Sequence, residues 1–139
     1  MFYKLFIVQN IITQGISSSM IKLFQISFFI CLLTIEYLAT TSTSIAIVEN
    51  SWDKANHFIA FFVLYILLDL GFKIFTTLGK VSVLVLFALQ IEIVQHFIPN
   101  RYFSLLDVVA DSVGILIAVG VLAFYNKYIK IKDTSYNRV

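Results

Sequence analysis

Four long apolar stretches constrain this chain more than any other feature of its sequence. They run from about Leu23 to Ala39, Ala55 to Ile74, Val81 to Ile98 and Leu105 to Tyr125. A helix needs about 20 residues to cross the ~30 Å hydrocarbon core of a membrane. Helices are favoured because every backbone polar group must be satisfied inside lipid, and one short chain cannot close a barrel. We therefore predict four membrane-spanning helices.

The charge content also indicates a membrane protein. Only 13% of the 139 residues are charged and 60% are hydrophobic, whereas soluble domains carry about 25% charged residues. So little charge cannot cover a water-facing surface, and we predict an all-α integral membrane bundle. The net charge of +2, without a basic patch, argues against nucleic acid as a partner. The single cysteine, Cys31, cannot form an intramolecular disulfide.

The distribution of lysine and arginine predicts the orientation. With four spans, both termini share a side with the loop between the second and third spans. That side holds eight of the ten cationic residues: Lys4, Lys22, Lys73, Lys80, Lys127, Lys130, Lys132 and Arg138. The other side holds Lys54 and Arg101, in the two outer loops. Cytoplasmic loops carry the excess of lysine and arginine, so we predict cytoplasmic termini.

The chain divides into three parts. The spans form a membrane domain over residues 20–126, and residues 127–139 form a basic tail attracted to anionic headgroups. The apolar part of residues 1–19 is too short and, with Gln9 and Asn10, too polar to span. An interfacial helix, a cleaved signal peptide and a functional start at Met20 are the three interpretations of this segment.

Ionisable residues inside the spans are the main clue to function, because each costs ~2.5 kcal/mol or more at the membrane centre. Four-residue spacing puts one set of side chains on one face of the second span: Asp53, His57, Phe61, Tyr65 and Asp69. A second set shares a face of the third span: Glu92, Gln95 and His96. The fourth span has Asp107 and Asp111 four residues apart. On their flank lies a ridge of small residues that a neighbouring helix can approach closely: Ala110, Gly114 and Ala118.

The directions of the spans place most of these residues at one depth. The second and fourth spans enter from outside, and the first and third end there. Ten polar residues are thereby expected within or near two turns of the outer surface: Glu36, Asp53, Lys54, His57, Glu92, Gln95, His96, Arg101, Asp107 and Asp111. Asp69 is expected towards the cytoplasmic side. We predict one outer-leaflet cavity with carboxylates at its floor and Lys54 and Arg101 at its rim.

Part of this set has a simpler structural explanation. Asp53 and Lys54 suit a helix start, and Ser104 with Asp107 matches a capping box, S-x-x-D. A histidine such as His57, taken alone, is more often a core side chain bonded to a carboxylate. Capping cannot explain Glu92 and Asp111, which lie deeper. Interhelical hydrogen bonds worth about 0.6–2 kcal/mol hardly offset the burial of several carboxylates, which favours a functional role.

Four spaced elements resemble the VanZ-like family. They are "DKANHF" from Asp53, "EIVQ" from Glu92, "PNR" from Pro99 and "SLLDVVADSVG" from Ser104, and the likeness covers roughly residues 20 to 125. Many relatives look to have asparagine where this chain has Asp111, a departure that adds a negative charge. The resemblance implies a small multi-pass protein of a bacterial cell membrane. The family's namesake is associated with teicoplanin resistance, and the family has no generally agreed reaction.

Three functional hypotheses follow. The first is a protein that binds or modifies the headgroup of an amphiphile, such as a lipid, a lipid-linked cell-envelope precursor or a lipoglycopeptide. The second is a proton or cation pathway that Asp69 extends inward. The third is an assembly or stabilising subunit whose polar network only fixes helix packing. Partners are then membrane lipids or an amphiphile, with a membrane-protein partner or a second copy of the chain also open.

The first hypothesis assigns roles to two groups of residues. The candidate catalytic residues, for acid–base or nucleophilic chemistry, are His57, Glu92, Asp107 and Asp111. The candidate ligand-binding residues are Asp53, Lys54, Gln95 and Arg101. Of these, Lys54 and Arg101 would hold a phosphate or carboxylate. No cofactor is predicted, and the question of a metal stays open, since oxygen ligands with His57 suit a divalent cation but their spacing is not diagnostic.

Overall fold

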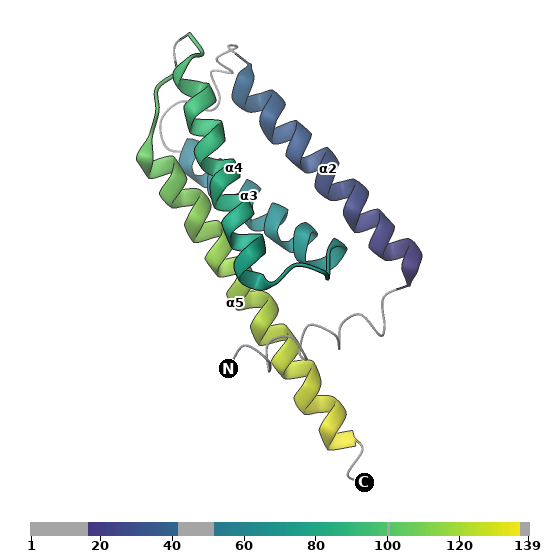
Figure 1. Ribbon diagram of the computed structural model, residues 1–139. Helices are drawn as coiled ribbons and strands as arrows, with labels where there is room; N and C mark the ends of the chain where they lie inside the picture. Colours follow the sequence, from purple (N-terminus) through teal and green to yellow (C-terminus); the bar gives the residue numbers. More distant parts are fainter. Residues whose placement is uncertain (1–16, 42–51, 100, 137–139) are drawn as a thin grey trace.

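Four helices make up the described part of the chain. The computed structural model describes residues 17–41, 52–99 and 101–136, without the side chains of residues 52, 53 and 129–136. Its helices are α2 (Ser18–Thr40), α3 (Trp52–Gly71), α4 (Thr77–His96) and α5 (Leu105–Tyr136) (Figure 1). Each is long and apolar enough to cross a membrane. The predicted all-α architecture with four candidate spans is confirmed, whereas the interpretations of residues 1–19 fall almost wholly outside the described residues.

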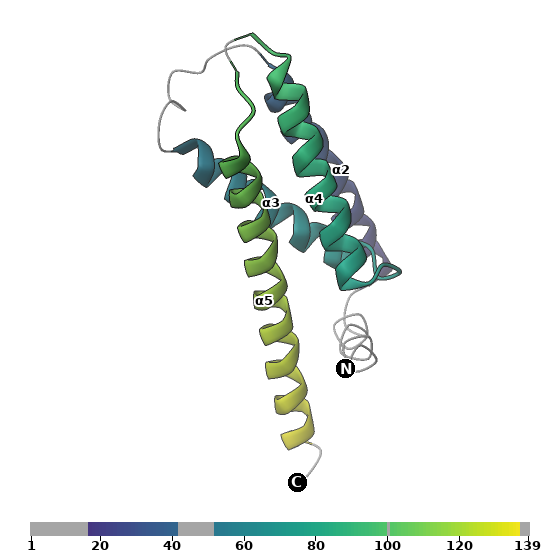
Figure 2. The same ribbon diagram turned by 60° about the vertical axis from the view of Figure 1, so that its left-hand side comes forward.

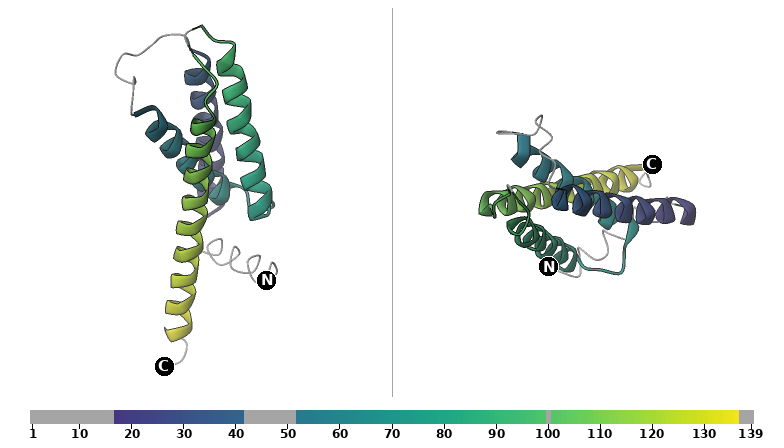
Figure 3. Two further views of the ribbon diagram at one scale, coloured as in Figure 1. Left: turned by 90° about the vertical axis from the view of Figure 1, so that its left-hand side faces the viewer. Right: turned by 90° about the horizontal axis from the view of Figure 1, so that it is seen from above.

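The helices are arranged so that their predicted outer ends lie together. The C-terminal ends of α2 and α4 and the N-terminal ends of α3 and α5 point towards the upper end of Figure 1. Figures 2 and 3 show α3 tilted across the other helices, which run more nearly along one axis. The most extensive packing of α3 is against α5, followed by that against α2. α3 is therefore the central helix of the bundle.

Local capping sets where the helices begin. The Ser17 hydroxyl accepts a hydrogen bond from the Met20 N–H at 3.3 Å, and the Thr76 hydroxyl accepts one from the Gly79 N–H at 3.1 Å. Each cap satisfies one of the orphan donors at a helix start. α2 and α4 consequently begin several residues before the predicted spans.

α5 is longer than predicted. It continues past Tyr125 to Tyr136, because no glycine or proline occurs in that stretch to end it. At 1.5 Å per residue its 32 residues extend about 48 Å. This exceeds the ~30 Å hydrocarbon core, and Figure 1 shows the end of α5 projecting beyond the other helices.

α3 and α5 approach each other closely at Gly114. A Cβ atom built there would lie 2.4 Å from the carbonyl oxygen of Phe58, so the α3 backbone fills the space that any side chain would need. Ala118, one turn further along α5, is also fully buried. The predicted ridge of small residues is therefore where α3 packs, and it brings the polar ends of both helices within reach of each other.

α2 contributes little to the core. Phe28 and Ala39 are its only buried residues, while most of its large apolar side chains are exposed in the way expected of a lipid-facing helix. Its Gln25 side chain donates from Nε2 to the Gly71 carbonyl at 2.9 Å, which fastens α2 to the end of α3.

A buried ion pair joins α3 and α4 at the predicted cytoplasmic end. Lys80 Nζ lies 2.7 Å from Asp69 Oδ1, and both residues are at least 95% buried. Lys73, in the connection between the two helices, lies 3.6 Å from Asp69 Oδ2. Burial lowers the pKa of Lys73, an effect that the nearby Asp69 charge opposes. The charge pattern predicts Lys80 in an inner loop, whereas it lies within the first turn of α4.

Candidate functional site

His57 and Asp111 form the centre of a polar cluster at the predicted outer end of the bundle. His57 Nδ1 lies 3.1 Å from Asp111 Oδ1. The Asp111 side chain is fully buried and that of His57 is 13% exposed. The two helices can bring these side chains together because Gly114 allows their backbones to approach one turn deeper.

Glu92 of α4 closes the cluster from the other side. It is fully buried, and its Oε2 accepts a hydrogen bond from the backbone N–H of Ser104 at 2.8 Å. A capping box would direct that N–H to the Asp107 carboxylate instead. The predicted capping box is therefore wrong, because a carboxylate from another helix takes its place.

Asp107 lies next to both His57 and Glu92. One potential ligand atom from each of these three residues lies within 4.8 Å of the other two. Asp107 Oδ1 accepts no hydrogen bond from the described residues, and the Lys54 ammonium is 3.5 Å away. Side chains of three helices thus meet in one place.

Gln95 and Arg101 extend the cluster towards α2. In the amide orientation that satisfies both neighbours, Gln95 Nε2 donates to Glu92 Oε1 at 3.2 Å and its Oε1 accepts from Arg101 Nη1 at 2.7 Å. Arg101 Nη2 also donates to the Leu38 carbonyl at 3.3 Å. Arg101 therefore links the end of α2 to the cluster and uses part of its five-donor guanidinium to do so.

Lys54 is the more accessible cation of the cluster. It belongs to the first turn of α3 rather than to the predicted outer loop, and its side chain is 54% exposed. Asp53 lies beside it in the helix, but the Asp53 side chain is outside the described residues.

Two residues predicted near the cluster lie elsewhere. His96 is exposed and packs edge-on against Phe97, whereas Gln95 in the same turn is buried, so His96 lies on the side of α4 that faces away from the cluster. Glu36 accepts a hydrogen bond from Gln90 Nε2 at 3.1 Å, which forms a separate polar contact between α2 and α4. Gln90 was not predicted to take part, because a single glutamine on an apolar helix gives no periodic signal.

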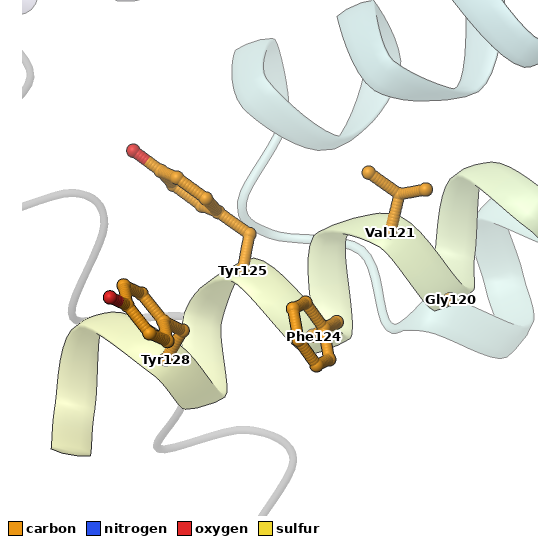
Figure 4. Close-up of a pocket in the computed structure, with 5 residues that line it drawn as sticks. All are labelled: Gly120, Val121, Phe124, Tyr125 and Tyr128. Carbon is orange, nitrogen blue, oxygen red and sulfur yellow. The ribbon is translucent and has the colours of Figure 1, made fainter.

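A separate hollow lies near the other end of α5. Its volume is about 380 Å³, and its lining is apolar: Gly120, Val121, Phe124, Tyr125 and Tyr128 (Figure 4). Asp111 is nine residues before Gly120, or about 14 Å along the helix. Apart from the two tyrosine hydroxyls, this lining offers no side chain for acid–base chemistry or metal binding. The chemistry of the described residues is therefore concentrated in the polar cluster.

Comparison with protein families gives one match. A family described as VanZ/LLP1 matches residues 1–126, which is most of the chain and begins before the resemblance predicted from the motifs. The chain belongs to the VanZ/LLP1 family. Searches of curated proteins and of solved structures found no significant match. In this VanZ-like protein, the described motif residues lie together in the polar cluster: Lys54, His57, Glu92, Gln95, Arg101, Asp107 and Asp111.

Proposed function

We propose that this VanZ-like protein binds the polar headgroup of an amphiphile at the outer leaflet of a bacterial cell membrane, with both termini in the cytoplasm. One observation carries the proposal: polar side chains from α3, α4 and α5 gather at the predicted outer end, where Lys54 and His57 remain partly exposed. A ligand can approach these two residues from the membrane surface while its hydrocarbon part stays in lipid.

The proposed binding uses different groups for different parts of the ligand. Lys54 and the remaining donors of Arg101 suit an anionic group such as a phosphate or carboxylate. Buried carboxylates accept hydrogen bonds from hydroxyl or amine groups of a headgroup. The His57–Asp111 pair resembles a base held by an orienting carboxylate, so proton transfer to or from a bound headgroup is the chemistry that these residues favour.

The proton-pathway alternative has less support. Asp69, which would extend such a pathway, lies in the buried ion pair with Lys80. On the same face of α3, the buried rings of Phe61 and Tyr65 occupy the positions between His57 and Asp69. A continuous polar route along this face of α3 is therefore interrupted by aromatic side chains.

Lipid retention by the purified protein tests the proposal. The protein in a neutral detergent would be incubated with a polyprenyl phosphate and the matching polyprenol, in the presence of EDTA, and the retained lipids would be quantified by mass spectrometry. We expect selective retention of the phosphate. Lys54→Gln should reduce that retention about tenfold, as expected from the loss of one charge-assisted contact of ~1.5 kcal/mol or more.

Lys127→Gln is the matched control. Lys127 is an exposed lysine of α5 far from the cluster, so its replacement should leave retention unchanged. Equal retention of the phosphate and the alcohol, or an equal loss in both lysine variants, would rule out a specific headgroup site. Loss of folded protein in Lys54→Gln would instead support an assembly role.

A further inference from the structure

We propose that His57, Glu92 and Asp107 bind a divalent transition-metal ion, with Asp111 as the outer carboxylate that orients His57. The inference concerns the same cluster and rests on the functional site proposed above. It adds a metal ion to that site. Neither the family match nor the helix topology implies a metal.

The spacing of the three residues is the first argument. Their potential ligand atoms lie within 4.8 Å of one another. Nitrogen and oxygen ligands lie ~2.0–2.2 Å from an ion such as Zn²⁺, so two ligands at the tetrahedral angle are ~3.4 Å apart. Side-chain rotations that shorten these separations by roughly 1 Å would therefore complete the site. The ligands come from three helices, so the helix packing holds them near this geometry.

The charges of the cluster supply a second, independent argument. Three buried carboxylates meet here, from Glu92, Asp107 and Asp111. Lys54 forms an ion pair with one of them, Asp107. Asp107 is nine-tenths buried, and its Oδ1 accepts no hydrogen bond from the described residues. Three carboxylates buried so close together are stable only if a cation or bound protons compensate their charge, and a divalent ion would compensate two negative charges at once.

The contact between His57 and Asp111 is a third argument. Metal-binding histidines almost always have a carboxylate, carbonyl or water bonded to one ring nitrogen, which fixes the ring for the metal. His57 Nδ1 has this relationship to Asp111 Oδ1 at 3.1 Å. Glu92 is oriented in a comparable way by the Ser104 N–H and Gln95.

The ligand types select the class of metal. Ca²⁺ and Mg²⁺ favour sites made of oxygen ligands, whereas an imidazole together with carboxylates suits Zn²⁺ or Mn²⁺. Three protein ligands leave coordination positions for water or for a ligand atom.

Metal titration of the intact protein tests the inference without any lipid. The full chain would be purified in a neutral detergent, stripped with EDTA, desalted and titrated with Zn²⁺ by calorimetry, with bound Mn²⁺ followed separately by electron paramagnetic resonance. We expect one saturable site. Asp107→Asn and His57→Ala should each weaken Zn²⁺ binding at least 100-fold, and Asp111→Asn about 10- to 100-fold, as for other outer carboxylates.

The second histidine provides the matched control. His96 is exposed at the end of α4, so His96→Ala should bind Zn²⁺ as the wild type does. Lys54→Gln should strengthen Zn²⁺ binding severalfold, because it removes an ammonium that competes for Asp107, although the same change weakens lipid retention. This opposite effect distinguishes a metal site from a loss of folding.

Two outcomes would overturn the metal site. One is the absence of saturable Zn²⁺ or Mn²⁺ binding to folded wild-type protein, and the other is equal binding by His57→Ala and His96→Ala. Because lipid retention is measured in EDTA and metal binding without lipid, either proposal can fail while the other stands.

Discussion

Asp111 is the position at which the competing functions make opposite predictions. Asp111 Oδ1 lies 3.1 Å from His57 Nδ1, where it can accept a hydrogen bond from a protonated Nδ1. The side-chain oxygen of an asparagine at this position can accept the same hydrogen bond. Asp111→Asn should therefore retain polyprenyl phosphate in EDTA nearly as well as wild type. Asp111→Ala should lose most retention, because removing a buried partner costs about 1–3 kcal/mol. If Asp111→Asn proves as defective as Asp111→Ala, a titrating group is required and the proton pathway gains support.

The buried ion pair at the other end makes a prediction about stability. Removing one partner of a buried pair costs about 3–5 kcal/mol. Asp69→Leu should lower the free energy of unfolding more than Lys80→Met does, because it leaves the Lys73 and Lys80 ammonium groups without this carboxylate. In Lys80→Met, Lys73 still lies 3.6 Å from Asp69. The double variant Asp69→Leu/Lys80→Met should recover most of the loss. Thermal unfolding in detergent measures these differences, and equal melting temperatures for all three variants would contradict the prediction.

Residue spacing alone predicts part of the site. His57 and Asp111 each begin or continue a four-residue series, so helical periodicity assigns them to inward faces. Glu92 is recognisable by its depth in an apolar span. His96 cannot be excluded in this way, because its spacing from Glu92 does not reveal which side of the last turn of α4 is covered: Gln95 is buried and His96 is exposed. The link from Ser104 to Glu92 is equally hidden, since a backbone donor has no sequence signature.

At the scale of helices, the α3–α5 contact gives the sharpest prediction. Gly114→Ala places a methyl group 2.4 Å from the Phe58 carbonyl, so the two helices must separate. We expect a loss of about 1–3 kcal/mol, typical of overpacking. Lipid retention should fall as well, because His57 and Asp111 move apart. Gly120→Ala is the matched control, since a Cβ there meets nothing within 4 Å, and it should be neutral or stabilise the helix by up to ~1 kcal/mol.

Helix centres are predictable from the sequence and helix ends are not. Continuous apolar runs place the middle of each span, because lipid tolerates few polar side chains over ~30 Å. The ends depend on single hydroxyl groups such as those of Ser17 and Thr76, whose capping bonds form only in the right backbone geometry. The extension of α5 to Tyr136 arises in polar sequence, where hydropathy gives no information.

For the whole molecule, the prediction concerns orientation in the membrane. Tyr102, between α4 and α5, is 85% exposed and Ile74, between α3 and α4, is 84% exposed. In a Cys31→Ala background, a membrane-impermeant maleimide should label Tyr102→Cys from outside intact cells and should not label Ile74→Cys. Both variants should react after the cells are opened. The reverse pattern would place the polar cluster on the cytoplasmic side and remove the basis for an outer-leaflet ligand.

The pairing of Asp69 with Lys80 also bears on how the chain enters the membrane during synthesis. Only residues 72–76 separate the end of α3 from the start of α4. Presented alone, α4 would carry an uncompensated ammonium into lipid at a cost, and α3 a carboxylate that lacks its contact with Lys80. Presented as a hairpin, the two segments neutralise each other at 2.7 Å. Insertion of α3 and α4 together, as a hairpin, is therefore more favourable than insertion of either helix alone, because Asp69 and Lys80 are already paired when the hairpin enters the lipid.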